Sequence, residues 1–443
     1  MAEAVSSRRA GEQVLAALSP PSRTYWLVML GLLSIVGVMF ATWGYQVRMG
    51  MGVAGINHPV GWGPYIVNFV FWVGIAHSGT LISAVLYIFR VRWRMAISRS
   101  AEAMTVFAVM TAGLFPMIHL GRVWVFYFLF PYPNTAGLWP NFKSPLVWDV
   151  VAVSTYFTVS SLFFYLGMIP DLASARDVAT GWRRKLYTIL AMGWQGKYEQ
   201  WRHHARAYTC LAALATPLVI SVHSVVSWDF AMSLLPGWHT TIFAPYFVAG
   251  AIHSGLAMVI TLLLPMRKLL KLEGVITMKH LSSMAQLTIL MGLIIAYAYG
   301  LEAWTAWYSA NEFEWSFAKF RLFGHYGHWY WTMVFCNCVA PMAFFSKRVR
   351  SDWRGLLLVS ILINIGMWLE RFVIIVGSTA HDFMPASWGL YRISVPETVE
   401  TIGAFAFFLT LFLLFAKHLP CVAINEVKEL ALHQQHEAKE AAS

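Results

Sequence analysis

The sequence predicts an all-α integral membrane protein with ten transmembrane helices. Of its 443 residues, 58% are hydrophobic and only 12% are charged, whereas a soluble domain carries about 25% charged residues. The mean hydropathy is +0.58. Apolar runs recur along the chain at the length of about 20 residues that a helix needs to cross the hydrocarbon core. An open sheet is excluded, because lipid-exposed strand edges would leave backbone groups without hydrogen bonds.

The ten spans follow directly from these apolar runs. We place them at 25–45, 63–89, 103–130, 146–168, 207–232, 241–265, 282–308, 328–346, 355–376 and 400–418. The polar segment before the first span has no apolar core with a cleavage site, so we interpret it as a retained tail. The polar tail after Pro420 has helical propensity and is expected to fray.

Lysine and arginine set the direction of the spans, because cytoplasmic connections carry an excess of both. With the N-terminus inside, 25 of the 32 basic residues fall in cytoplasmic segments. The outer segments hold five, Arg48, Lys143, Lys319, Arg321 and Arg392. Both termini are therefore predicted to be cytoplasmic. The net charge of +11 is a topology signal, and no nucleic acid partner is predicted.

One motif occurs twice and indicates a duplication. VGIAHSGTLISAVLYIFR (73–90) and APYFVAGAIHSGLAMVI (244–260) place His77 and His253 in the second and sixth spans. HLGRVWVFYF (119–128) similarly matches AYGLEAWTAWY (298–308), and SWDF loosely matches MWLERF. We predict two pseudo-symmetric four-helix bundles, spans two to five and six to nine, related by an axis along the membrane normal. The first and tenth spans would be peripheral.

This repeat gives a domain organisation of six segments. They are a cytoplasmic tail (1–24), the first span with its outer loop (25–60), the first bundle (61–232), the second bundle (233–376), an outer loop with the tenth span (377–419) and a C-terminal tail (420–443).

Ten polar residues fall in or at the mouths of the predicted spans. A charged residue at the centre of a span costs about 2.5–3.5 kcal/mol, so these side chains should face the bundle interior and pair. His119 and Arg122 should share a helix face, whereas Glu370 and Arg371 diverge by about 100° and should each pair with another helix. Most of the set lies in the outer half of its spans: Arg122, Asp149, Asp229, Glu302, Glu370, Arg371, His119 and His223, with His77 and His253 near the middle.

A quinol-oxidising site fits this outer cluster. Quinol oxidation needs an apolar slot, hydrogen-bond partners for two hydroxyls and a base, which an aspartate with a histidine supplies. His119 and Asp149 end adjacent antiparallel spans, and the connection FPYPNTAGLWPNFKSP between them can roof a pocket. The aromatic residues near this slot are Trp124, Phe126, Tyr127, Trp139, Trp148, Tyr156 and Trp228.

The electrons of such a reaction would have to leave through a partner. The four cysteines form no C-x-x-C or C-x-x-C-H motif, so the usual signatures of cluster ligation and covalent haem are missing. No metal site is predicted. The outer loops 131–145, 233–240, 309–327 and 377–398 are aromatic and weakly charged, which suits a docked redox protein.

Other interpretations remain open at this point. Arg122, Glu302 and Arg371 could form structural ion pairs, His223 could be a satisfied core residue, and His77 and His253 could serve helix packing beside Ser and Gly. A proton-coupled transporter would also combine repeats with ionisable residues. A haem anchor could use His77 and His253 as axial ligands, and an inert scaffold would need none of these groups.

The ten-span plan, the paired bundles, HLGR in span three, WD at the head of span four and NIGMWLERF in span nine resemble the polysulfide-reductase membrane-subunit (NrfD-like) family. The resemblance covers nearly the whole chain. Within the family, it looks most like the ActC-type subunits of bacterial alternative complex III, with the ActF type similar.

The resemblance implies a subunit of a respiratory quinol oxidoreductase without a covalently bound cofactor. It would sit in a bacterial inner membrane and oxidise menaquinol near the periplasmic face. Electrons would pass to a periplasmic iron–sulfur subunit, with c-type haems on cytochrome subunits beyond, beside a sister NrfD-like membrane subunit. Proton translocation would accompany the reaction.

The resemblance also implies roles for individual residues. His119, Asp149 and Asp229 would form the quinol and proton-release group. Quinol binding would be supported by Arg122, Trp124, Trp148, His223 and Arg371, and the proton path would use His77, His253, Glu302 and Glu370.

Overall fold

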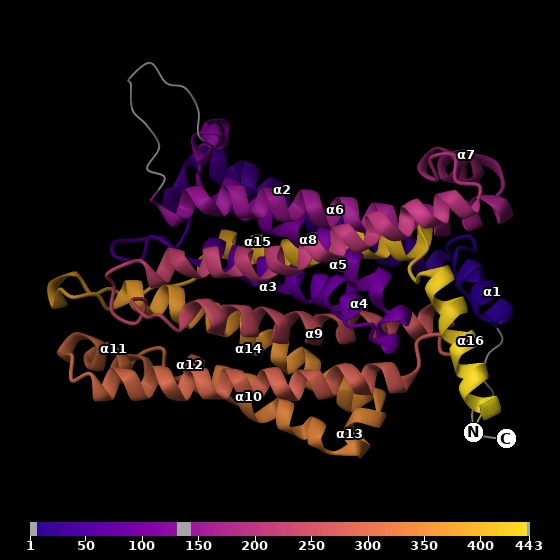
Figure 1. The fold of residues 1–443 in the computed structure, drawn as a ribbon. Coiled ribbons are helices and arrows are strands. Elements are labelled where there is room, and N and C mark those ends of the chain that lie inside the picture. The colour runs from indigo at the N-terminus through magenta and orange to yellow at the C-terminus, as the bar shows by residue number, and fades with distance from the viewer. Residues whose placement is uncertain (1–6, 131–142, 441–443) are drawn as a thin grey trace.

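The computed structural model describes residues 7–130 and 143–440, and all regular secondary structure in these residues is helical. Within them, nine helices are long and apolar enough to cross a membrane. The long helices run side by side, and both termini lie at the same end of the bundle (Figure 1). We call that end the terminal face and the other end the opposite face.

The predicted first bundle is a closed ring of four helical rods. α3 (Pro64–Thr80) continues through a π-helical turn, η2 (Leu81–Val85), into α4 (Leu86–Ile88). α3 packs on α5 (Ser98–His119), α5 on α6 (Pro145–Val178), α6 on α8 (Tyr198–Ala231), and α8 back on α3.

The predicted second bundle contains α9 (Phe243–Leu269), α10 (Met278–Tyr308), the eighth span and α14 (Trp353–Ala380). The eighth span is not a uniform helix. It consists of α12 (Gly327–Val334), the π-helical η5 (Phe335–Val339) and the 3-10 helix η6 (Ala340–Phe345). Pro341 explains the irregularity, because proline cannot donate to the carbonyl one turn before it and clashes with that turn.

The two bundles meet along α3 and α9, which are the most deeply buried spanning helices. A Cβ at Gly255 would overlap the Ser78 side chain, so the serine of one His-Ser-Gly motif fills the space left by the glycine of the other. Small residues of this kind let membrane helices approach closely. In the predicted repeat, α3 corresponds to α9 and α8 corresponds to α14. The contact of α8 with α9 is therefore the equivalent of the contact of α14 with α3, and both contacts are present.

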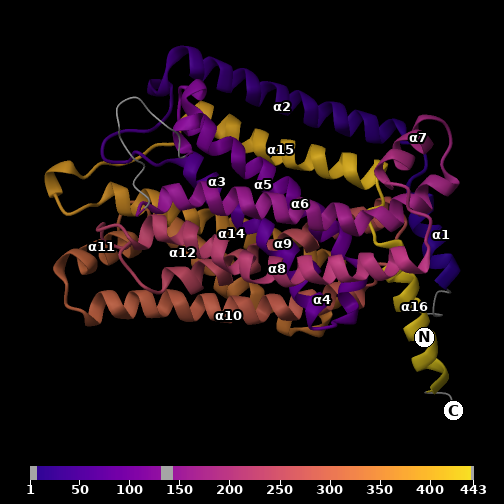
Figure 2. The same ribbon diagram turned by 45° about the horizontal axis from the view of Figure 1, so that its top comes forward.

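The predicted peripheral helices are α2 (Arg23–Met49) and α15 (Val395–His418), and they pack on each other along one edge of the molecule (Figure 2). α2 is the least buried of the spanning helices. α15 also packs on α3 and α5, so its inner side belongs to the core.

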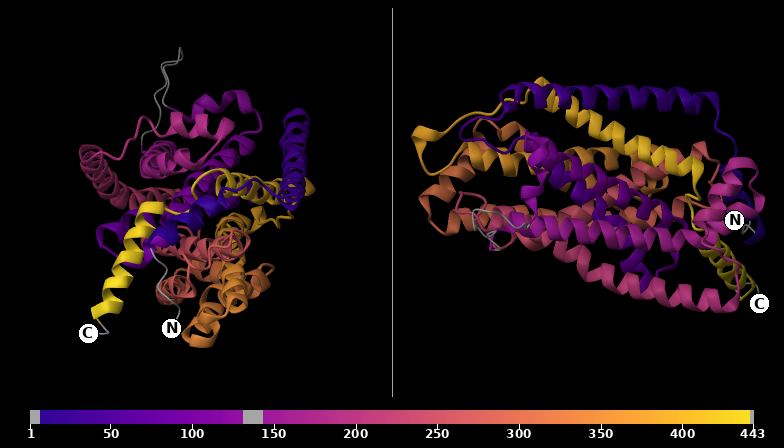
Figure 3. Two further views of the ribbon diagram at one scale, coloured as in Figure 1. Left: turned by 90° about the vertical axis from the view of Figure 1, so that its right-hand side faces the viewer. Right: turned by 90° about the horizontal axis from the view of Figure 1, so that it is seen from above.

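Short elements cover both faces. At the terminal face α16 (Ile424–Glu440) packs on α1 (Ser7–Ala17), so the tail that we expected to fray is a docked helix (Figure 3). The other elements between spans are η3 (Arg92–Ala96), α7 (Gly181–Leu190) and α13 (Lys347–Ser351), and, toward the opposite face, η1 (Met51–Val53), η4 (Val123–Leu129), α11 (Glu312–Phe323) and η7 (Pro385–Ser387).

Several helix ends differ from those predicted. α5 and α8 begin earlier than expected, at Ser98 and Tyr198, and α6 continues to Val178. α5 ends at His119 instead of reaching residue 130, because Gly121 adopts a left-handed conformation with φ +68°. A glycine in this conformation is a common helix terminator.

Candidate functional site

Asp149 and Asp229 face each other at the opposite face, where α6 begins and α8 ends. Asp149 lies one turn after Ser144 and Pro145 start α6, and Asp229 lies two residues before the last residue of α8. Their carboxyl groups are within hydrogen-bonding reach of each other. Such a bond requires a proton on one carboxyl group, because an ionised carboxylate can only accept. The pair can therefore hold a proton and exchange it with a bound ligand.

Each carboxyl group of this pair also retains free hydrogen-bonding capacity. Asp149 is 6% exposed, and one oxygen on each aspartate is buried without a hydrogen-bond partner in the described part of the chain. Buried polar atoms in folded proteins are nearly always satisfied, so unsatisfied ones need an explanation such as a ligand, an ion or a water molecule that binds there.

His119 is the last residue of α5, which packs on α6. No hydrogen bond or ion pair joins it to Asp149 among the described residues. Its ring centroid lies 6.2 Å from that of Tyr65, and its Nδ1 atom is buried without a partner. His119 and the aspartate pair therefore lie at the ends of packed helices near the opposite face, as separate groups.

Two glutamates near Tyr65 were missed by the sequence reasoning. The Tyr65 hydroxyl donates to the Gln46 side chain at 2.6 Å and also lies beside Glu400 of α15. Glu400 is fully buried, and neither of its carboxylate oxygens has a hydrogen-bond partner in the described residues. Glu397, one turn earlier, is fully satisfied by Gly55 N at 3.0 Å, Ser394 N at 2.8 Å and the Tyr391 hydroxyl.

The sequence did contain a signal for part of this cluster. Ser394 to Glu397 reads S-V-P-E before an apolar run, and the structure has the capping box that this pattern predicts. Glu400 has no comparable signal. A glutamate near the start of a predicted span is expected to be exposed, whereas Glu400 is buried.

The remaining predicted quinol-support residues at this face are exposed. Arg122 lies beyond the end of α5, so the helix face that it was predicted to share with His119 does not exist. Trp124 is 63% and Trp148 is 47% exposed. Trp139 and most of the loop expected to roof the pocket lie outside the described residues.

Two of the predicted histidines meet at mid-depth in the first bundle. The ring centroids of His77 and His223 are 4.5 Å apart, and Tyr156 of α6 lies 5.4 Å from His77. His77 Nδ1 is 2.8 Å from the Val73 carbonyl, whereas its Nε2 atom and both nitrogens of His223 have no partner in the described residues. The Tyr156 hydroxyl reaches Thr80 at 2.7 Å. These groups lie one to two helical turns inside Asp149 and Asp229.

The polar residues of the second bundle form a paired cluster instead. Glu370 and Arg371 contact each other, which contradicts our expectation that they would diverge to different helices. The Tyr299 hydroxyl donates to Glu370 and accepts from Asn337 at 2.9 Å, and the Arg371 guanidinium lies 4.6 Å from the Phe247 ring.

His253 is fully buried, and both of its ring nitrogens are unsatisfied in the described residues. It points toward α10, where a Cβ at Gly292 would lie 3.4 Å from its ring. His77 instead faces α6 and α8. The close contact of Ser78 with Gly255 leaves no room for a haem between the two histidines.

Glu302 forms an ion pair at the opposite face of the second bundle. Its partner is Arg321 of α11, at 2.5 Å. Burial alone would lower the pKa of Arg321, but the Glu302 carboxylate, together with Tyr330 and Tyr246, raises the pKa above the usual value. Glu302 therefore has a structural partner.

A second missed network lies at the terminal face of the first bundle. Arg99 binds Glu102 at 2.6 Å and Asp171 at 3.1 Å, and the Tyr208 hydroxyl donates to Glu102 at 2.9 Å. All three charged side chains are nearly fully buried. α16 completes the network, since Asp171 accepts from the backbone N–H of Ile424.

Arg94 extends this network by binding Glu426 at 3.0 Å. Burial alone would lower the pKa of Arg94, but Glu426, together with Tyr208 and Glu102, raises it. We missed these residues because they fell just outside the predicted ends of spans three and four, where basic residues were read as topology signals.

The described residues contain no cluster of three or more His, Cys, Asp or Glu side chains arranged to hold a metal ion. The four cysteines are free thiols.

Comparison with known families identifies the scaffold. Residues 52–381 match the family model described as polysulphide reductase, NrfD. The chain belongs to the NrfD family. This match spans both four-helix bundles and excludes α2 and α15 entirely.

Three curated proteins are similar to this NrfD-family chain. A putative membrane subunit of dimethyl sulfoxide reductase from Halobacterium salinarum is 29% identical over 53% of this chain and 50% of its own length. A selenate reductase subunit from Mesobacillus selenatarsenatis is 22% identical over 54% and 55%. An Hdr-like menaquinol oxidoreductase integral membrane subunit from Archaeoglobus fulgidus is 19% identical over 92% and 96%. The chain thus spans about half the length of the first two relatives and nearly all of the third.

Proposed function

We propose that this NrfD-family chain is the membrane subunit of a menaquinol:acceptor oxidoreductase and binds quinol at the opposite face. The observation that carries this proposal is the group of buried polar atoms without partners on Asp149, Asp229 and His119. A quinol between the end of α5 and the aspartate pair offers a hydroxyl to each side. The relative named as a menaquinol oxidoreductase subunit, which matches nearly the whole chain, supports the choice of quinol.

The chemistry is a loss of two protons and two electrons from the quinol, giving the quinone. The Asp149–Asp229 pair takes one proton as a general base. His119 Nδ1 takes the other. An iron–sulfur subunit docked on the opposite face would accept the two electrons one at a time. The c-type cytochrome subunits would be later acceptors, and a sister membrane subunit would lie alongside.

The proton on His119 has an onward route in this proposal. Tyr65 lies beside His119 and within hydrogen-bonding reach of the Glu400 carboxylate, so it can relay a proton between them. Inward from the aspartates, Tyr156, His77 and His223 form a second polar route, which would serve proton translocation.

The terminal face is cytoplasmic in this proposal, and the membrane is the bacterial inner membrane. The basic residues of the connections, which are concentrated at the terminal face, support this orientation. Assignment to the ActC type of alternative complex III rests on the sequence resemblance alone. A transporter is less well supported, because the interruptions at η2 and η5 lie in spans two and eight, which are not repeat mates.

Asp149→Asn tests the proposal in membranes that contain the assembled complex. The measurement is the rate of electron transfer from menaquinol to a soluble acceptor, normalised to assembled complex. We expect a loss of about 100-fold, since a positioned base typically contributes 10²–10⁴. The matched control is Glu312→Gln, an exposed acid at the same face, which should keep the wild-type rate. An unchanged rate in Asp149→Asn would contradict the proposal that quinol is oxidised at this site.

A further inference from the structure

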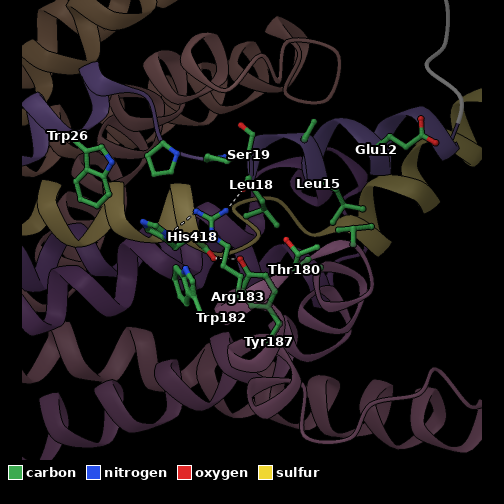
Figure 4. Close-up of a pocket in the computed structure, with 17 residues that line it drawn as sticks. Glu12, Leu15, Leu18, Ser19, Trp26, Thr180, Trp182, Arg183, Tyr187 and His418 are labelled. Atoms are coloured by element: carbon green, nitrogen blue, oxygen red, sulfur yellow. Dashed lines mark hydrogen bonds between the residues drawn. The ribbon is translucent and has the colours of Figure 1, made fainter.

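A large hollow lies at the terminal face, away from the proposed quinol site. Its volume is about 1,090 Å³, and it forms where the α1–α2 connection meets the hinge between α6 and α7 and the end of α15 (Figure 4). Pockets of this size accommodate ligands as large as a lipid headgroup with the first part of its chains.

Two cations held by neutral groups lie at this hollow: Arg183 lines it, and Lys417 lies just outside its lining, next in sequence to His418. Arg183 donates to the Leu18 carbonyl, and its other terminal nitrogen lies 3.4 Å from His418 Nδ1. Lys417 donates to the Ala17 carbonyl at 2.9 Å and lies 3.3 Å from the Ser19 hydroxyl. Neither cation forms an ion pair with a carboxylate in the described residues.

The acid that lines the hollow does not neutralise these cations. Glu12 instead pairs with Arg8 on α1 at 2.9 Å. Figure 4 shows Arg183 and His418 pointing toward each other, with Trp182 and Tyr187 beside them. Because Glu12 is paired with Arg8, the positive charges of Arg183 in the wall and of Lys417 beside it are not matched by a carboxylate of the lining. A planar guanidinium and a flexible ammonium group both suit a phosphate group.

The walls beside these cations are largely apolar and include two exposed tryptophans. Trp26 is 53% and Trp182 is 61% exposed, and both line the hollow. Tryptophan is enriched where hydrocarbon meets headgroups. From Trp26 the exposed apolar side of α2 continues through Leu27 and Leu30, and α7 exposes Leu186 and Ile189 beside Arg184 and Lys185, as interfacial helices do.

We propose that this hollow binds an anionic phospholipid of the leaflet at the terminal face. Its phosphate accepts hydrogen bonds from Arg183 and Lys417, and its acyl chains follow the apolar side of α2 from Trp26. A zwitterionic lipid fits less well, because its cationic end would face two positive charges that no carboxylate of the lining matches. Basic pockets between spanning helices on one face are a known setting for anionic headgroups.

Such a lipid would join elements that are far apart in the chain. Arg183 belongs to α7, Leu18 to the α1–α2 connection and His418 to the end of α15. A ligand that binds only the folded arrangement stabilises it by mass action. The site is independent of quinol oxidation and would persist if that proposal failed.

The test uses the full chain, purified and delipidated in detergent. Native mass spectrometry counts bound lipid, and a thermal-shift assay follows stability, after adding phosphatidylglycerol, phosphatidylcholine with the same chains, or inorganic phosphate. We expect phosphatidylglycerol to remain bound and to raise the melting temperature, and the other two to do neither. In Arg183→Gln its affinity should fall about 10- to 100-fold, the effect of losing a charged hydrogen bond.

Arg206→Gln is the matched control, since it removes an exposed arginine near the same face outside the hollow and should bind as wild type. Equal binding of phosphatidylcholine, an equal effect of inorganic phosphate, or unchanged affinity in Arg183→Gln would each overturn the proposal. If Arg183→Gln does not fold, the wild-type comparison decides alone: failure to retain phosphatidylglycerol overturns the site.

Discussion

The two faces of the first bundle both bury charged residues, but they differ in how those residues are satisfied. At the terminal face Arg99, Glu102 and Asp171 bind one another and the groups around them. At the opposite face Asp149, Asp229 and Glu400 keep carboxylate oxygens without partners in the described residues. Since unpaired buried charge is expensive, the second arrangement needs a ligand or proton to complete it. Burial without partners, more than burial itself, marks the candidate site.

The largest expected effect is on the paired network. Arg99→Gln leaves Glu102 and Asp171 buried without their cation, and breaking a buried pair in this way costs about 3–5 kcal/mol. We expect a much lower yield of folded protein and a lower thermal midpoint in detergent. The quinol oxidation rate per assembled complex should stay near wild type, because Arg99 lies at the far end of α5 from His119.

Arg202→Gln is the control for this prediction. Arg202 and Glu199 form an ion pair with the same sequence spacing as Arg99 and Glu102, but both side chains are largely exposed. Exposed pairs contribute about 0–1 kcal/mol, so this variant should be nearly neutral. Equal stability of the two variants would show that the terminal network is not structural.

The second effect concerns the aspartate pair as a unit. Asp149→Asn and Asp229→Asn should each lower quinol oxidation about 100-fold, and the double variant should be no slower than either single one. Residues that act together are non-additive in this way. Rates in matched membranes give the double-mutant cycle, and multiplicative losses would mean that the two carboxyl groups act separately.

Periodicity and composition predicted the spanning segments, because whether a segment spans the membrane depends mainly on its own apolar run. The nine long helices of the described residues, the duplicated His-Ser-Gly contact and the peripheral position of α2 all follow from apolar runs and the repeat. The ends of the helices were harder to place. Polar residues such as Glu102 and Asp171 extend a helix beyond its apolar run when another element, here α16, covers them.

The side-chain partners could not be predicted from spacing. His119 and Asp149 end adjacent spans, yet His119 lies beside Tyr65 and Asp149 beside Asp229. The direction of a side chain depends on where the helix ends, and Gly121 ends α5 earlier than the hydrophobic pattern indicated. Glu400 was missed for a related reason, because α15 looks peripheral in sequence while its inner side is buried in the structure.

A smaller effect is expected at the second bundle, where Glu302 is paired although it lies at the opposite face. Glu302→Gln leaves Arg321 without its carboxylate and should cost about 2 kcal/mol, less than a fully buried pair because Glu302 is 13% exposed. Thermal unfolding measures this cost. A quinol oxidation rate that stays within about twofold of wild type would place Glu302 with the structural pairs. A larger loss of rate would support the predicted role of Glu302 in the proton path.

The smallest effect should separate two glutamates on one helix. Glu397 accepts three hydrogen bonds. In Glu397→Gln the side-chain NH2 group would face the N–H and O–H groups that donate to the carboxylate, so the variant should cost about 1–3 kcal/mol of stability. The amide oxygen of Glu400→Gln can still accept from the Tyr65 hydroxyl that lies beside it, so stability should change little. The substitution removes the proton acceptor beside Tyr65, so quinol oxidation should fall roughly tenfold, less than for a directly contacting base.

The solvent isotope effect on the rate distinguishes this role from packing: it should change in Glu400→Gln and stay at the wild-type value in Glu397→Gln. A Glu400→Gln enzyme with unchanged rate and isotope effect would leave His119 without this onward route, and the proton path would then run through the aspartate pair alone.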